Sequence, residues 1–237
     1  MTSEVYEIAN PTIRQVFGEF LAEQQQRLSA RTFAEYRYIV ELLEDSLNGY
    51  AYSGLDDDEA ELFDRLYNAE GDEHREFCEI FGPEKIPENV GEFLHYFMPH
   101  KVICGKDLLR AAGTTMRKLG TWLSENGYIN AEAAADMAER GGEAAKDLPA
   151  AETLADTLDA YAERFTGAVS EEEDGHFTIE TVGPDSLVLS SFLEGDEFTV
   201  PVLKKAARMC EAGWTLSGGL GRTPRGWRLL EVWGVYT

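Results

Sequence analysis

The chain has few cysteines and few cations, and it contains no long apolar run. Its three cysteines, Cys78, Cys104 and Cys210, are an odd number at wide spacing. This pattern excludes a disulfide framework and is typical of a reducing compartment. The first ten residues contain no basic region before an apolar stretch, and about 18 apolar residues never follow one another. We therefore expect a cytoplasmic protein with no signal peptide and no membrane-spanning helix.

Sequence motifs of enzyme chemistry are also missing. The glycines of Gly218–Gly221 match neither a dinucleotide-binding nor a phosphate-binding loop, and no nucleophile elbow is present. The acidic run Asp56–Glu59 lacks the glycine spacing of a calcium loop. Carboxylates are so numerous that no catalytic pair stands out. We expect no enzymatic activity, no catalytic residue and no cofactor.

The chain is strongly acidic overall. The 44 acidic residues against 21 basic ones give a net charge of -23. Residues 100–124 contain five cations against Asp107 alone, and residues 201–237 contain six against two acids. Each of these stretches therefore carries +4, which leaves -31 on the rest of the chain. Any surface for a polyanion is expected in these two stretches.

The first two thirds of the chain have the apolar spacing of helices, three and four residues apart. Caps and breakers set the expected limits. The expected helical segments are 11–28, 30–47, one starting at Asp56–Glu59, 90–97 ending before Pro99, 105–126, 131–145 broken at Gly141–Gly142, and one after Leu148–Pro149.

The segment 105–126 combines an apolar face with a ridge of cations. At about 100° per residue, Lys106, Arg110 and Arg117 lie close together on the helix surface. The small residues between them, Gly113 and Thr114–Thr115, would let a phosphate backbone approach and offer it hydroxyl donors. The alternative is a surface helix whose cations neutralise the acidic remainder of its own domain.

Two segments resemble the core-binding domain of tyrosine recombinases and phage integrases. In that family a Leu-Ser-x-x-Thr-x-x-x-Tyr helix start is followed later by Thr-x-x-x-x-Leu-x-x-Phe/Trp-x-x-Leu, and the helical bundle clamps duplex DNA. The matching positions are Leu28, Ser29, Thr32 and Tyr36, then Thr114, Leu119, Trp122 and Leu123.

The resemblance covers about residues 28–129 and has two departures. An acidic insertion, residues 51–82, separates the matching helices. None of the four histidines has an arginine three residues later, and too little chain follows for the family's catalytic domain. The resemblance therefore implies DNA contact by a helical bundle, and strand exchange is not expected.

The last part of the chain changes to the period of strands. Expected strands are 176–182, 187–193, 198–202, 214–220 and 227–236, with a helix over 203–210 and a turn at 194–196. This order predicts a small five-stranded β-barrel of the OB or SH3-like type. The charged segment 170–175 is the expected linker. The predicted organisation is α+β, with an acidic helical domain at 1–169 and the barrel at 176–237.

The aromatic residues of the barrel have two interpretations. With arginines between them, they have the composition of a platform that stacks bases beside phosphate-binding cations. In regular alternation, however, Trp227, Leu229, Glu231 and Trp233 share one face while Arg228, Leu230 and Val232 share the other, so part of the set belongs to the core. The aromatic set is Trp214, Trp227, Trp233 and Tyr236.

A zinc site is a further alternative. His74 and Cys78 are four residues apart, as are His100 and Cys104, so together they have the composition of a Cys2His2 site. Pro99 interrupts the second pair, and free cysteines often act as small buried apolar residues.

The sequence thus predicts a non-enzymatic DNA-associated or regulatory protein. The alternative is an interaction protein that binds another protein, with an acidic surface that keeps it in solution or imitates DNA. The expected phosphate contacts are Lys106, Arg110, Thr114, Arg117, Lys118, Arg222, Arg225 and Arg228.

Overall fold

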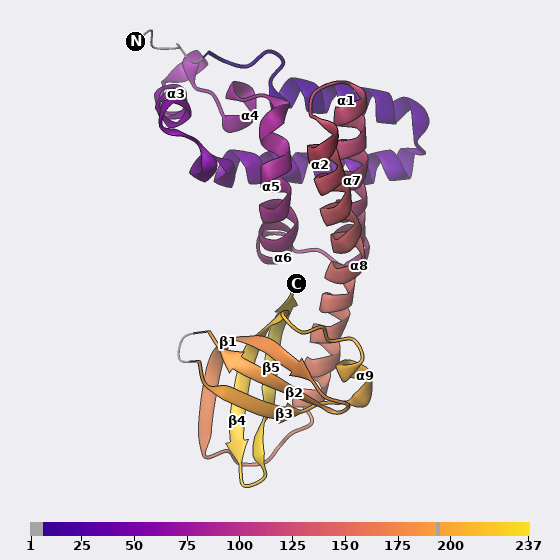
Figure 1. Cartoon of the computed structure of the whole chain (residues 1–237), viewed down its shortest axis with the longest axis vertical. Helices are drawn as coiled ribbons and strands as arrows, with labels where there is room; N and C mark the ends of the chain where they lie inside the picture. The colour runs from indigo at the N-terminus through magenta and orange to yellow at the C-terminus, as the bar shows by residue number, and fades with distance from the viewer. Residues whose placement is uncertain (1–6, 193–194) are drawn as a thin grey trace. The chain divides into compact units, whose positions relative to one another are not determined.

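The computed structural model describes residues 7–192 and 195–237 and confirms an α+β protein, with helices first and an antiparallel sheet last (Figure 1). The chain forms two compact units. The helical unit runs to Cys104 and continues over Leu108–Ala145. The sheet unit consists of Gly105–Asp107 and Lys146–Thr237. Leu193 and Glu194, expected in a strand and the turn after it, lie outside the described residues.

Capping side chains fix the starts of the first helices. Helix α1 (Ile13–Arg27) begins after Thr12 rather than at Pro11, because Thr12 and Gln15 form a reciprocal capping box. Helix α2 (Ala30–Tyr50) is capped by Ser29, as predicted. It continues past Gly49, the expected end, into the 3-10 turn η1 (Ala51–Gly54).

The acidic insertion is structured. Asp56 caps α3 (Asp57–Tyr67) by accepting the backbone N–H groups of Asp58 and Glu59 at 3.1 and 2.9 Å. This confirms the prediction that the acidic run starts a helix, where negative charge is favourable. The 3-10 turn η2 (Gly71–Glu73) and the short helix α4 (Phe77–Ile80) complete the insertion.

Pro99 does not end the next helical segment. The turn η3 (Pro83–Lys85) leads into α5 (Ile86–Glu92), the π-helical turn η4 (Phe93–Phe97) and α6 (Met98–Lys101). Pro99 lies in the first turn of α6. The wider turn before it accommodates a residue that has no N–H to donate.

Two long helices follow. Helix α7 (Lys106–Glu125) confirms the prediction within a residue. Helix α8 (Ala131–Ala162) is continuous through Gly141, Gly142 and Pro149, so the predicted breaks are wrong. Buried residues along both halves of α8, from Met137 to Leu158, stabilise it beyond its intrinsic propensity.

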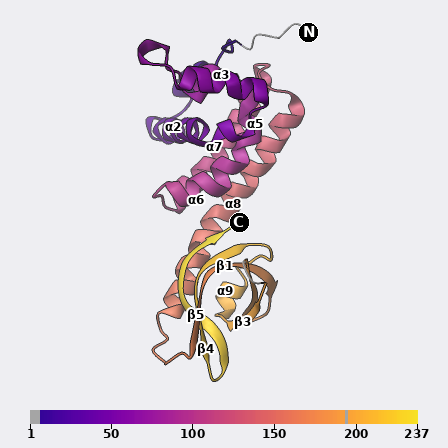
Figure 2. The ribbon, with the colours of Figure 1, turned by 90° about the vertical axis from the view of Figure 1, so that its left-hand side faces the viewer.

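Five antiparallel strands form one sheet in the order β3-β2-β1-β4-β5. The strand β1 pairs with both β2 and β4. The edge strands β3 and β5 approach each other, so the sheet curls into a half-barrel (Figure 2). The bounds are β1 (Glu171–Val182), β2 (Ser186–Ser191), β3 (Glu197–Pro201), β4 (Thr215–Thr223) and β5 (Gly226–Tyr236), with the short helix α9 (Lys204–Ala207) between β3 and β4.

The second half of α8 belongs to the core of the half-barrel. Leu154 and Leu158 are fully buried there with Phe177 and Leu216. Residues 171–175, all but the first residue of the expected linker 170–175, lie in β1 and pair with β4. The main segment of the sheet unit accordingly starts at Lys146, well before the expected boundary.

Two bulges break the alternation of β5. The pairing with β4 skips Leu230 and Trp233, so Val232 turns into the core and Trp233 turns out. A Cβ on Gly218 would lie 2.3 Å from the Glu231 carbonyl oxygen, so this pairing requires glycine. The Val232 N–H donates to the Asp159 carboxylate of α8 at 3.0 Å. The expected common face of Trp227 and Trp233 is therefore wrong.

Candidate functional site

Helix α8 packs against α7 beside its row of cations. Gly113 lies next to that row, and a Cβ there would lie 2.4 Å from the Gly141 carbonyl oxygen and 2.5 Å from the Ala145 nitrogen. A Cβ on Gly141 would in turn lie 2.6 Å from the Gly113 carbonyl oxygen. The two backbones thus cross in close contact, which only glycine permits. The expectation that Gly113 leaves room for a phosphate backbone is wrong, because α8 occupies that room.

The expected hydroxyl donors beside these cations already have other roles. The Thr114 hydroxyl donates to the Arg110 carbonyl oxygen at 2.9 Å within its own helix. Thr115 is completely buried, and its hydroxyl has no hydrogen-bond partner among the described residues. In this structure the Thr114 hydroxyl proton is thus engaged within the helix, and Thr115 is closed to a partner.

The cations of α7 differ in their surroundings. The Lys106 ammonium is 2.8 Å from the Asp156 carboxylate, within the sheet unit. Arg110 is exposed on the helical unit. Arg117 and Lys118 are exposed too, and neither forms an ion pair with any residue in 7–192 or 195–237. Of the predicted ridge, Arg117 with the adjacent Lys118 is the part most accessible to a partner.

The basic turn between β4 and β5 is partly neutralised. Arg222 forms an ion pair with Glu171 at 3.0 Å. Arg228 is half-buried, with its guanidinium 3.8 Å from the centre of the Phe165 ring, and its Nε lacks a hydrogen-bond partner within the described ranges. Arg225 is exposed and, among the described residues, without an ion pair. Arg228 therefore acts mainly in packing, and Arg225 is the accessible cation of this turn.

The aromatic residues of the half-barrel are mostly core. Trp214 is buried, and Trp227 packs edge-on against Phe198 at 4.9 Å between ring centres. Tyr236 is half-buried. Trp233 is 54% exposed because its bulge turns it outward. This confirms the core interpretation for part of the set, and Trp233 stays available for contact.

The histidines and cysteines have separate partners. Cys78 is buried with its sulfur 3.9 Å from the Glu44 carbonyl oxygen, and His74 Nδ1 lies 2.6 Å from the Tyr67 carbonyl oxygen. Cys104 lies 3.8 Å from the Met98 carbonyl oxygen, and His100 Nδ1 2.9 Å from that of Tyr96. Within the described part of the chain, no group of three His, Cys, Asp or Glu residues is placed to hold a metal ion.

We expect the three thiols to react at different rates. Burial raises the pKa of Cys210 to about 11 and raises the pKa of Cys78 well above its usual range. Because the thiolate is the reactive form, both should react slowly with Ellman's reagent at pH 8 in the folded protein. Half-buried Cys104 should give the fast phase. Cys104→Ser should remove that phase and Cys210→Ser should keep it; a fast phase that survives Cys104→Ser would contradict the assignment.

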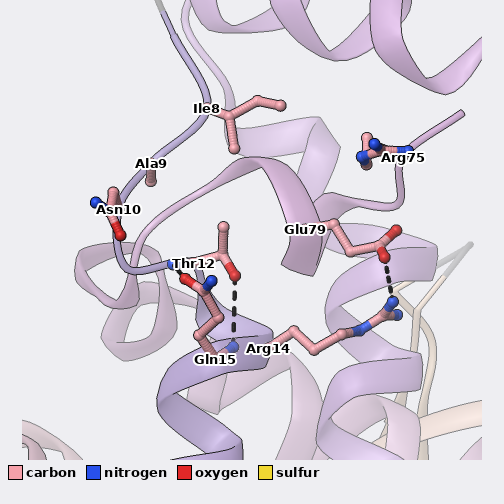
Figure 3. A pocket seen from close by; sticks show the side chains of 8 residues that line it. All are labelled: Ile8, Ala9, Asn10, Thr12, Arg14, Gln15, Arg75 and Glu79. Atoms are coloured by element: carbon pink, nitrogen blue, oxygen red, sulfur yellow. Dashed lines mark hydrogen bonds and ion pairs between the residues drawn. The ribbon is translucent and has the colours of Figure 1, made fainter. Parts of the chain in front are cut away.

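An open pocket of 530 Å³ lies beside the start of α1 (Figure 3). Arg14 forms ion pairs with Glu44 and Glu79. Partial burial alone lowers the pKa of Arg14, but the bond and charge of Glu44 raise it overall. Arg75 donates to the carbonyl oxygens of Asp72 and His74. Arg14, Glu79 and Arg75 of the pocket are thus already engaged with carboxylates, guanidinium or backbone carbonyl oxygens.

Sequence reasoning missed an aromatic stack in the acidic insertion. The rings of Tyr52 and Phe63 are stacked 5.8 Å apart at 3°, and those of Phe63 and Tyr67 are stacked 5.1 Å apart at 22°. Phe63 is buried, whereas Tyr52 and Tyr67 are 51% and 43% exposed. The four-residue spacing of Phe63 and Tyr67 on one helix was the available signal.

Several residues on which the integrase resemblance depends cap a helix or pack in the core of the helical unit. Ser29 caps α2, and Tyr36 stacks on Phe20 at 6.5 Å. Trp122 packs edge-on against the same ring at 5.4 Å and donates its indole N–H to Glu23 at 2.7 Å. These contacts hold α1, α2 and α7 together.

Comparison of the chain with protein-family models, with curated proteins and with solved structures finds no match. None of the helices in the described ranges is both long and apolar enough to cross a membrane.

Proposed function

We propose that the chain is a non-enzymatic interaction protein whose helical unit binds another protein. One observation carries this proposal: α8 occupies the space at Gly113 where a phosphate backbone was expected, with backbone contact between Gly113 and Gly141. The acidic insertion meanwhile contains eleven acidic residues and two arginines, a net charge of -9, and exposes aromatic rings. Such a surface repels nucleic acid and attracts basic protein surfaces.

Affinity capture tests this proposal. The full-length protein, immobilised, should retain a defined protein from an extract of its own cells in near-stoichiometric amount, and nuclease treatment should not change that amount. An unrelated protein of similar acidic charge serves as the matched control for non-specific attraction. Retention of nucleic acid alone, or of nothing beyond the control, would overturn the proposal.

A second candidate function is contact with DNA. Arg117, Lys118 and Arg225 favour it, since all three are exposed and form no ion pair with a described residue. The half-barrel adds support. The pairing of β1 with both β2 and β4, and the place of α9 between β3 and β4, favour the OB type over the SH3-like type. OB-folds bind oligonucleotides partly through the β4–β5 loop, which here carries Arg225.

Fluorescence anisotropy with duplex and single-stranded DNA across a salt series separates the two candidates. If the chain acts by binding protein and not DNA, we expect it to bind neither kind of DNA even at low salt. If the chain contacts DNA, we expect its affinity for DNA to fall as salt rises. The slope of log affinity against log salt concentration should then be smaller by about 1 for each of Arg117→Ala and Lys118→Ala. Lys106→Ala is the matched control with a smaller expected change, because Asp156 already neutralises Lys106.

A further inference from the structure

The Tyr52–Phe63–Tyr67 stack is a preformed surface. Buried Phe63 lies between the two exposed tyrosines and rests on Phe77 and Phe81, at ring distances of 6.2 and 6.5 Å. The Tyr67 ring also lies 5.3 Å from the His74 ring, tilted by 54° to it. Rings held in this way lose little conformational entropy when a partner binds, so their exposed faces are efficient contacts.

Acidic residues are close to the stack in the sequence. Asp64 precedes Tyr67 by three residues, about one turn of α3. Further acids follow in the loop after Tyr67, at Glu70 and in η2. Of the two arginines in the insertion, Arg75 donates to backbone carbonyl oxygens. Aromatic faces and negative charge thus occur together.

From this combination we infer that the stack is a docking site for an arginine-bearing segment of a partner protein, an inference that rests on the proposed protein-binding function. Arginine suits the site better than lysine does. Its flat guanidinium stacks on aromatic rings while its N–H groups bond to carboxylates, whereas the lysine ammonium is a compact, strongly hydrated charge. A second copy of this chain, at -23, and nucleic acid are both repelled by an insertion at -9.

Two labelled peptides test the inference by fluorescence anisotropy on the full-length protein near physiological salt. One has five Gly-Arg repeats and the other has five Gly-Lys repeats. Contacts with two rings should make the arginine peptide bind about tenfold more tightly. Tyr52→Ala with Tyr67→Ala should remove that difference and leave the weaker lysine binding nearly unchanged. Tyr38→Ala is the matched control, because Tyr38 is a 45% exposed tyrosine of α2 outside the stack.

Equal affinity for both peptides, or no binding of either, would overturn the inference, and this comparison needs no variant that might unfold. Unchanged arginine binding in the double alanine variant would also overturn it. The double variant Tyr52→Phe with Tyr67→Phe keeps the rings and should bind like the wild type. If captured partners are retained equally by wild type and double alanine variant, the docking site fails while the protein-binding function stands. If nothing is captured, the function fails whatever the peptides do.

Discussion

Replacing Gly113 by alanine is expected to lower the free energy of unfolding of the helical unit by about 3 kcal/mol, at the upper end of the usual cost of overpacking. The new Cβ would meet the Gly141 carbonyl oxygen and the Ala145 nitrogen at 2.4 and 2.5 Å. Both are backbone atoms of α8, so no side chain can turn away, and the two helices must move apart. Urea unfolding followed by helical circular dichroism at 222 nm measures the change.

Gly142→Ala is the matched control for this prediction. Gly142 is the neighbour of Gly141 on α8, but a Cβ there meets nothing within 4 Å. Alanine at this position should stabilise the protein by about 0.5 to 1 kcal/mol, since glycine is the weaker helix former. A Gly113→Ala protein as stable as the Gly142→Ala protein would contradict the close crossing of α7 and α8.

A fragment of residues 146–237 is expected to fold, whereas residues 171–237 should not. The shorter fragment loses the second half of α8, including the buried Leu154 and Leu158. Removal of a single buried leucine side chain typically costs about 2 to 5 kcal/mol. The loss of two, together with the Asp159 bond to Val232, approaches the whole stability of a small domain. Dispersion of amide signals in a proton–nitrogen NMR spectrum distinguishes folded from unfolded fragments.

Point variants of the longer fragment provide the control. Leu158→Ala should destabilise it by about 2 to 5 kcal/mol. Asp156→Ala, at an exposed position of the same helix whose ion-pair partner Lys106 is absent from the fragment, should change the stability by about 0.5 kcal/mol or less. Cooperative folding of residues 171–237 would show that the sheet does not depend on α8.

Apolar spacing and capping residues were sufficient to predict most elements. Ser29 and the run starting at Asp56 mark helix starts in sequence and in structure alike. The prediction of breaks at Gly141–Gly142 and Pro149 was wrong, because it used the local propensity alone, which favours a helix break at such residues. Packing of α8 in both units outweighs that propensity, and the packing depends on residues far away in the sequence.

The candidate site was harder to predict for a physical reason. A helical wheel groups Lys106, Arg110 and Arg117 correctly, but it does not tell which face a later helix will cover. Gly113 has two possible explanations, close approach of a ligand or close approach of a helix, and its partner Gly141 follows 28 residues later. In β5, each bulge reverses the faces of the residues beyond it, so alternation failed at Trp233.

These bulges also affect how the open sheet behaves in a crowded solution. An edge strand with evenly spaced backbone groups is a template for the strands of other chains, and such pairing leads to aggregation. In β5 the extra residues Leu230 and Trp233 interrupt that spacing, and Asp159 already occupies the Val232 N–H. The edge strand on the other side, β3, lies next to β5. The half-barrel thus stays incompletely closed while offering a foreign strand few places to pair.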